Sequence, residues 1–129
     1  MKKVIIDGIE YIPKEIEIWT DPKTGLIWEK FGSKKKMSWK KALEYAKTLG
    51  SGWRLPTIQE LITLINFSKN NPACKISGTY SSYYWSSTAY VGYTGYAWYI
   101  HFSYGDMSYG DKNKNYYIRC VKEGDNYAN

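Results

Sequence analysis

Hydrophobic and polar residues alternate along part of the C-terminal half of the chain, as expected of a β-strand. Between residues 96 and 103, one parity holds Trp98, Ile100 and Phe102. The opposite parity holds Tyr99, His101 and Ser103. Because successive side chains of a strand point to opposite faces, the pattern predicts a strand whose apolar set faces a core and whose second set faces outward.

Shorter segments with strand composition are separated by turn signals. Asp7-Gly8 predicts a type I′ turn in an N-terminal hairpin. Asp21-Pro22 and Gly25 predict a second turn. A third turn is expected at residues 104–106, followed by a short strand or loop with Met107 inward. The remaining strands are expected at residues 4–6, 9–12, 15–20, 26–28, 83–88 and 116–122.

Two segments have the apolar spacing of amphipathic helices. Ser38 is an N-cap candidate for a helix that continues to Leu49, with Gly50 at its C-terminus. Thr57 and Glu60 have the spacing of a capping box, and the helix that they open should end near Phe67. We therefore predict an α+β fold in which two helices pack on a small, twisted antiparallel sheet, beside a loop-rich half.

The length and the charge limit the possible classes of protein. The 129 residues predict a single domain over 1–129, and the net charge is +6. The lysines concentrate in the first half, for example at residues 34–36 and 40–41, whereas the aromatic second half is nearly neutral. Nucleic-acid readers usually mix basic residues with their aromatics, so a nucleic-acid partner is not expected.

The apolar runs are short. None approaches the roughly 20 residues of a membrane-spanning helix, so membrane insertion is not expected. The run that follows Lys2 and Lys3 stops after three residues, which is too short for a signal peptide. The expected location is the cytoplasm, or a phage or virus-like particle.

Chemically reactive residues are few. Cys74 and Cys120 are too few for a zinc site. They could form a disulfide or remain two buried thiols. His101 is the single histidine, and neither a nucleophile elbow nor a glycine-rich phosphate loop is present. We therefore expect a binding protein and not an enzyme, with no cofactor and no metal.

Residues 80–121 have the composition of a binding surface. They contain eleven of the fourteen tyrosines. Tyrosine with Ser, Gly, Asn and Asp is typical of binding surfaces, where rigid rings give contact area at low entropic cost. Some aromatic residues must still fill a core, and those expected there are Trp85, Trp98, Phe102 and Tyr116.

Six sequence blocks between residues 24 and 122 match a known pattern in order. They are Thr-Gly-Leu-Ile-Trp (24–28), Ser-Trp-Lys-Lys-Ala-Leu (38–43), Trp-Arg-Leu-Pro-Thr-Ile-Gln-Glu-Leu (53–61), Tyr-Trp-Ser-Ser-Thr (84–88), Ala-Trp (97–98) and Tyr-Ile-Arg-Cys-Val (117–121). The chain thereby resembles the C-type-lectin-like domain of bacterial collagen-like adhesins and of variable proteins from diversity-generating retroelements. Residues 1–20 have no counterpart in that pattern and are interpreted as an added docking element.

The resemblance implies a diversified ligand-binding surface. In the retroelement proteins, error-prone copying at template adenines changes selected codons, commonly those of asparagine. Residues between the expected framework positions are asparagine or can be reached from its codons by changing adenines. The implied ligand-binding residues are Tyr90, Tyr93, Tyr96, Tyr99, His101, Ser103, Tyr104, Asp106, Ser108, Tyr109, Gly110, Asp111, Asn113 and Asn115.

The ligand implied is a protein or another macromolecule, and a carbohydrate stays open because tyrosine rings stack on sugars. A fixed-specificity adhesion or fibre-tip module is the alternative. The Glu-Pro-Asn, Gln-Pro-Asp and Trp-Asn-Asp motifs of calcium-dependent lectins do not occur. Binding is therefore expected to be independent of calcium. Cys74 and Cys120 do not fit the motif of the related formylglycine-generating enzymes either.

Overall fold

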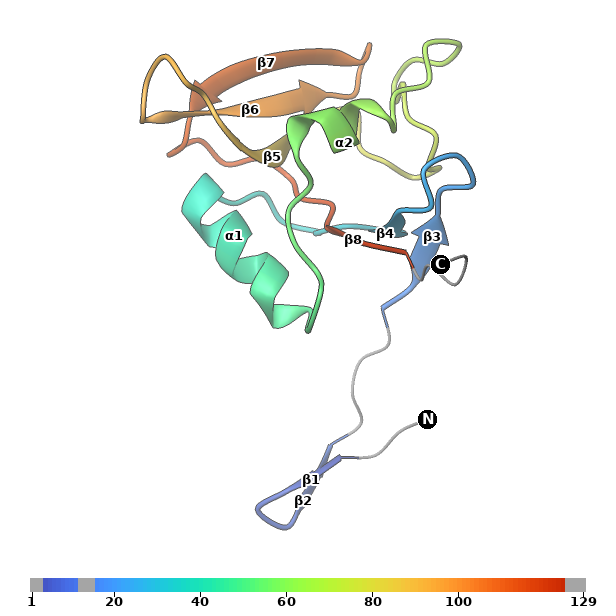
Figure 1. Ribbon diagram of the computed structural model, residues 1–129, viewed down its shortest axis with the longest axis vertical. Helices are drawn as coiled ribbons and strands as arrows, with labels where there is room; N and C mark the ends of the chain where they lie inside the picture. Colours follow the sequence, from blue (N-terminus) through green and yellow to red (C-terminus); the bar gives the residue numbers. More distant parts are fainter. Residues whose placement is uncertain (1–3, 12–15, 125–129) are drawn as a thin grey trace, which may run out of the picture.

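The computed structural model describes residues 4–11 and 16–124, and its elements can be followed in Figure 1. In chain order they are β1 (Val4–Ile6), β2 (Ile9–Tyr11), β3 (Ile18–Thr20), β4 (Ile27–Glu29), α1 (Trp39–Thr48), α2 (Ile58–Ile62), β5 (Tyr83–Ala89), β6 (Tyr96–His101), β7 (Asp106–Asp111) and β8 (Val121–Lys122).

The strands form antiparallel sheets of two sizes. β3-β4-β8 and β5-β6-β7 are three-stranded, and β1-β2 is a separate hairpin. The predicted α+β class is confirmed, with the strands that were expected in one sheet divided between two. In Figure 1, β5-β6-β7 lies at one end of the molecule and the β1-β2 hairpin at the other.

The predicted helix starts are confirmed. The Ser38 side chain accepts a hydrogen bond from the Lys41 amide, and Thr57 and Glu60 form the capping box. The second helix ends at Ile62 and not near Phe67. The segment after it pairs with residues 73–75, because the Asn66 amide donates to Ala73 O and the Lys75 amide donates to Leu64 O. Those long-range bonds take the chain out of the helix.

The β5-β6-β7 sheet is covered on both faces. The core cluster on the first face joins α2 to the sheet through Ile58, Leu61, Tyr84, Ile100 and Phe102. The core cluster on the second face joins α1 to the sheet through Ala42, Ala46, Trp85 and Ala97. Below, these are called the α2 face and the α1 face.

The strand predicted at residues 116–122 is mostly irregular, with isolated bridges at Tyr116 and Tyr117 and a regular strand from Val121. Between them lies Arg119, which is fully buried. Its guanidinium donates to the carbonyls of Glu29 and Lys30 and to the Thr79 hydroxyl. A buried guanidinium needs such acceptors, and they draw this segment out of a regular strand.

Cys74 and Cys120 are free thiols and do not form a disulfide with each other. Both are buried, Cys74 in the core cluster of the α2 face and Cys120 in that of the α1 face. Burial raises the pKa of the Cys120 thiol, and the nearby Glu29 carboxylate raises it further.

The N-terminal hairpin has the predicted turn, since Asp7 and Gly8 both have positive φ, at 51° and 77°. Across the described residues, no helix combines the length and the apolar character needed to cross a membrane.

Candidate ligand-binding surface

The β6-β7 hairpin carries most of the residues that the sequence nominates. Its turn depends on Gly105, which has φ of 86°. A Cβ atom at this position would lie 2.6 Å from Cγ2 of Ile65. Glycine therefore both permits the backbone conformation and lets the turn approach the core, which fixes where β7 begins.

The register of β6 and β7 divides the candidate residues between the two faces of the sheet. Directly opposed residues share a face, and the pairs Tyr96 with Asp111 and Trp98 with Tyr109 are opposed on the α2 face. On the α1 face the opposed pairs are Ala97 with Gly110, Tyr99 with Ser108 and His101 with Asp106. The structure therefore does not gather the candidates on one outward face.

On the α2 face, five aromatic rings form what we call the Tyr109 cluster: Tyr90, Tyr93, Tyr96, Trp98 and Tyr109. The rings of Tyr90 and Tyr109 stack with centroids 3.9 Å apart and planes 12° apart. Trp98 meets Tyr109 edge to face at 5.2 Å, and Tyr93 meets Tyr96 in the same way at 4.8 Å. Tyr93 and Tyr109 are 58% and 41% exposed, so the cluster is open to a ligand.

The Tyr90 and Tyr109 hydroxyls also interact. Their hydrogen bond raises the pKa of the Tyr90 phenol, and the charge that Tyr109 would carry as a phenolate raises it further. The Tyr90 phenol therefore remains neutral at physiological pH, and a tyrosine hydroxyl can donate or accept hydrogen bonds. The stack offers a flat apolar area with polar hydroxyl groups, which is the combination that suits aromatic residues to binding interfaces.

On the α1 face, four aromatic rings and an imidazole form the Tyr99 cluster: Tyr83, Trp85, Tyr99, His101 and Tyr116. The Tyr99 ring lies 5.0 Å from Tyr83 and 5.1 Å from Tyr116. Trp85 is fully buried beneath them, and its Nε1 donates to Met37 O at 3.0 Å. Desolvation raises the pKa of Tyr116, and the phenols of Tyr99 and Tyr83 and the Asp111 carboxylate add to that rise. This cluster is anchored in the core.

The predicted parity needs correction at three positions. Tyr99, expected to point outward, is half-buried against the core cluster of the α1 face. Trp98, expected in the core, is half-buried: it packs against the core cluster of the α2 face and also presents its ring to the Tyr109 cluster. Met107, expected inward, is 46% exposed. Each difference arises because both faces of the sheet are partly covered, so parity alone does not separate core from surface.

Sequence reasoning also left Trp98 and Tyr83 out of the candidate surface. Tyr83 is 37% exposed and touches both Tyr99 and His101. Strand parity gave no such signal for Tyr83, because it shares the parity of Trp85, which was expected in the core. Trp98 could have been placed beside Tyr109 only if its partner residue on the neighbouring strand were known, and the sequence does not specify that pairing.

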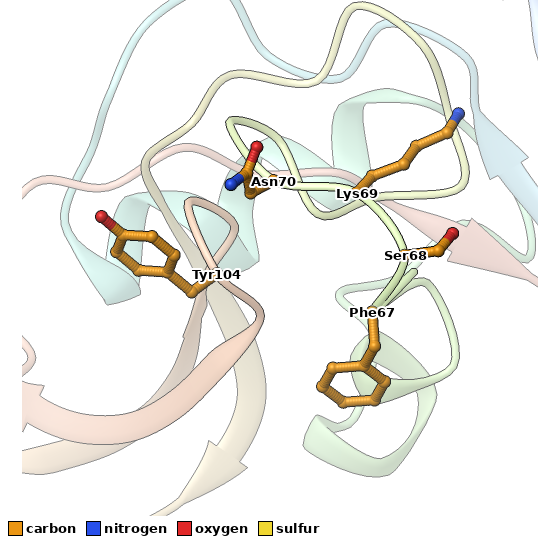
Figure 2. A pocket seen from close by; sticks show the side chains of 5 residues that line it. All are labelled: Phe67, Ser68, Lys69, Asn70 and Tyr104. Carbon is orange, nitrogen blue, oxygen red and sulfur yellow. The ribbon is translucent and has the colours of Figure 1, made fainter.

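Tyr104 lies apart from both clusters, at a small hollow of about 350 Å³. Figure 2 shows Tyr104 on the β6-β7 turn, and the other lining residues on the loop that follows α2. Phe67 and Tyr104 are 81% and 65% exposed. The two loops are joined where the Asn71 amide donates to Ser103 O at 2.8 Å. The lining residues are Phe67, Ser68, Lys69, Asn70 and Tyr104.

The other candidates lie at the ends of β7 and in its turns. Asp106, Ser108 and Asp111 on β7 are exposed, and so are Asn113 and Asn115 beyond it. The Asp111 carboxylate accepts from the Asn113 amide at 2.8 Å, which orders the turn after β7. None of the fourteen candidate residues is fully buried, whereas Ala97, Ile100 and Phe102 between them are 0% exposed.

His101 makes a local structural contact. Its Nδ1 accepts a hydrogen bond from the Ser103 amide at 3.2 Å, and Tyr83 lies edge-on to its ring at 4.2 Å. Asp106 is the opposed residue on β7, but among the described side chains no His101–Asp106 ion pair forms. In the part of the chain that the structure covers, His, Cys, Asp and Glu form no group of three or more suited to a metal ion.

Comparison with models of protein families identifies one that fits this fold. A family model described as the Lcl C-terminal domain matches residues 17–122. The match covers both three-stranded sheets, both helices and all fourteen candidate residues, and it leaves out the β1-β2 hairpin. No curated protein matches the chain.

Proposed function

Because the chain belongs to the family of Lcl C-terminal domains, which are C-type-lectin-like modules of adhesins and retroelement variable proteins, we propose that it is a ligand-binding variable protein of a diversity-generating retroelement. Its ligand is a protein or another macromolecule. The binding surface is the Tyr109 cluster with the exposed residues of β7 and its turns.

The observation that carries the proposal is the interleaving of accessible and buried positions. Apart from Tyr99, which packs against the core cluster of the α1 face, the residue types that can be reached from asparagine codons occupy sites that are at least partly accessible, and the intervening Ala97, Ile100 and Phe102 are fully buried. A gene that changes codons at random can tolerate changes only where the core is not disturbed, since surface substitutions usually change stability by no more than about 0.5 kcal/mol. This division suits diversification on a fixed scaffold.

The Tyr109 cluster supports a macromolecular ligand. Its stacked and edge-to-face rings form an open surface and not an enclosed cavity, and tyrosine on such a surface buries area at low entropic cost. Neighbouring Asp111 and Asn113 supply adaptable hydrogen bonds. These features fit a protein surface better than a small molecule that needs burial on most sides.

The decisive experiment is to sequence the locus around codons 90–115. We expect a nearby near-duplicate of this segment that carries AAC or AAT at the candidate positions, beside a reverse transcriptase gene. A locus with neither the duplicate nor the reverse transcriptase, in which every copy of the gene encodes the same residues, would contradict diversification.

The hollow between Phe67 and Tyr104 supports the alternative of a fixed-specificity adhesion module that binds a carbohydrate. Two exposed rings beside an amide and a hydroxyl are the groups with which proteins stack on and hydrogen-bond to sugars. A glycan array distinguishes the two functions. Binding to a defined glycan that is lost in both Phe67→Ala and Tyr104→Ala, and retained in Tyr109→Ala, would favour the adhesion module.

A further inference from the structure

The strand β7 forms an open edge of the β5-β6-β7 sheet. The strand order places β6 on one side of β7, and none of the described strands pairs with its other side. In Figure 1, β7 is the uppermost strand, and no other labelled element lies above it. All of its residues are exposed except Gly110, which is half-buried. The outer edge of β7 is therefore accessible along its length.

The hydrogen-bond pattern of the sheet shows which backbone groups of β7 are free. In an antiparallel pair, every second residue of a strand directs its N–H and C=O groups away from the neighbouring strand. The Lys112 amide donates to Gly95 O at 2.8 Å, which assigns the even-numbered residues of β7 to β6. The Phe102 amide donates to Ser82 O at 2.9 Å, which leaves the odd-numbered residues of β6 for β7. The two assignments agree, because the register pairs odd-numbered residues of β6 with even-numbered residues of β7.

Met107, Tyr109 and Asp111 therefore direct their backbone groups away from β6. Those of Met107 and Tyr109 bond to no other described part of the chain. The Asp111 carbonyl accepts from the Lys114 amide at 3.0 Å, so its amide alone remains free. The edge thus presents both backbone groups of Met107 and Tyr109, and the amide of Asp111, to a partner.

The opposite edge of the sheet, at β5, is covered by its own chain. The Tyr117 amide donates to Tyr83 O and the Trp85 amide donates to Tyr117 O, both at 3.0 Å. The Ser87 amide donates to Pro56 O at 2.7 Å, and the register of β5 is interrupted after Trp85. Proteins usually protect their edge strands by such coverage and irregularity, or by Lys and Pro residues. β7 has an unbroken register and contains neither Lys nor Pro, so it lacks these protections.

The charges on β7 indicate the kind of partner. Asp106 and Asp111 lie at its ends and are exposed, and the strand has no basic residue. The next residue, Lys112, is engaged elsewhere, because its Nζ donates to Thr94 O at 2.7 Å and lies 4.3 Å from the centroid of the Trp39 ring. Like charges on facing strands are destabilising and opposite charges are stabilising. A basic strand therefore suits this edge better than a second copy of β7.

We propose that β7 binds an extended segment of the protein ligand as an added strand, and that this segment carries Lys or Arg residues. The inference rests on the proposed function, since it specifies which feature of a protein ligand the surface recognises. Main-chain hydrogen bonds hold the added strand. Its alternate side chains lie beside Met107 and Tyr109 on the α2 face, or beside Ser108 and Gly110 on the α1 face.

This mode of binding suits a surface whose side chains vary. The backbone groups of β7 are the same whichever residues other than proline occupy positions 106–111. Main-chain hydrogen bonds would therefore give every variant the same basal contribution to affinity. The side chains at these positions would then determine which extended segment binds best.

The test is selection from a library of displayed peptides on the immobilised whole chain. Peptides of about eight residues cover the 6 residues of β7 and extend slightly beyond both ends. A selected peptide is then synthesised with an N-methyl group at each amide in turn. Methylation at alternate positions should weaken binding by at least about 10-fold, and methylation at the positions between them should have little effect. A peptide held only by its side chains would not show this alternation.

Two substitutions at Met107 test the same contact from the side of the protein. Met107→Pro removes the free amide without breaking a bond to β6, since proline is tolerated where the N–H of an edge strand faces solvent. Met107→Ala shortens the side chain and keeps the amide. Met107→Pro should therefore bind the peptide about 10-fold more weakly than Met107→Ala. Circular dichroism checks that both variants are folded, and the methylation series on wild type does not depend on either.

The possible outcomes separate the alternatives. A library without binders, methylation effects without alternation, or equal binding by the two Met107 variants would each overturn strand addition. Selected peptides without Lys or Arg would overturn the basic partner. A dimer of the whole chain that Met107→Pro abolishes, measured by sedimentation, would assign the edge to a second copy instead. None of these results bears on diversification, which the sequence of the locus tests separately.

Discussion

The Tyr109 cluster and the Tyr99 cluster lie on opposite faces of one three-stranded sheet and have similar compositions. Each contains several tyrosines and one tryptophan, in ring contacts of about 4 to 6 Å. Their tryptophans differ, because Trp85 is fully buried and Trp98 is half-buried. The first cluster is open to a partner, and the second is rooted in the core.

The difference shows that tyrosine content alone does not identify a binding surface. A tyrosine above a fully buried tryptophan, such as Tyr99, contributes to folding even where its edge reaches solvent. A tyrosine that stacks on another accessible tyrosine, such as Tyr109, is available to a ligand. Substitutions at matched positions of the two clusters test this division.

The largest difference is expected between the two tryptophans. Trp85→Ala empties a fully buried site and removes the hydrogen bond to Met37 O, so it should lower the free energy of unfolding by about 4 kcal/mol. Trp98→Ala, at a half-buried site, should cost about 2 kcal/mol. Urea unfolding measures both. Equal losses would mean that the two clusters are equally part of the core.

The central tyrosines should differ in the same direction. Tyr99→Ala removes contacts with Trp85, Tyr83 and Tyr116 and should cost about 2 kcal/mol. Tyr109→Ala removes an exposed ring and should cost about 0.5 kcal/mol. Thermal unfolding of the two variants gives the comparison. A loss at Tyr109 that exceeds the loss at Tyr99 would reverse the assignment of the clusters.

Alkaline pH should affect the Tyr99 cluster through Tyr116. Desolvation, followed by nearby phenols and Asp111, raises the pKa of Tyr116 above its unfolded value of 10.0. Its contribution to stability is therefore complete below pH 10.0 and is lost as the pH rises through the folded pKa. Between neutral pH and a pH above the folded pKa, the free energy of unfolding should therefore fall less in Tyr116→Phe than in wild type.

The matched control for this pH effect is Tyr93→Phe, at an exposed ring of the other cluster. This variant should follow the wild-type profile. If Tyr116→Phe and Tyr93→Phe give the same profile, burial of Tyr116 does not contribute to the alkaline loss.

The smallest effect is expected from Tyr109→Phe. The stacked ring is retained, so stability should change by no more than about 0.5 kcal/mol. The hydrogen bond that raises the pKa of Tyr90 is lost, and that pKa should fall toward 10.0. NMR titration of the assigned tyrosine ring resonances separates Tyr90 from the other tyrosines and detects the shift. An unchanged Tyr90 titration would show that the two hydroxyls do not interact.

Local signals in the sequence predicted much of the scaffold. The Asp7-Gly8 turn, the Ser38 cap and the Thr57–Glu60 capping box all occur as expected. Each depends on residues within one turn of chain, so the sequence contains the whole interaction. Ile100 and Phe102 were also correctly assigned to the core, because strand parity places them on the face that α2 covers.

The end of α2 and the path of residues 116–122 could not be predicted in this way. The first depends on hydrogen bonds between residues 64–66 and 73–75, and the second on acceptors that reach Arg119 from β4 and from Thr79. A run of helix-forming or strand-forming residues carries no information about these distant partners. The sequence also could not show whether Cys74 and Cys120 form a disulfide, because that depends on their positions in two different core clusters.

By itself, the sequence determined the α+β class, the helix starts, the family and a set of candidate residues of which none is fully buried. Only the tertiary structure decided which tyrosines are free to meet a ligand. That outcome depends on α1 covering one face of β5-β6-β7 and α2 the other, through residues such as Ala42 and Ile58 that lie far from the tyrosines in the chain. Alternation along a strand specifies two faces, but what packs on each face is set by long-range contacts.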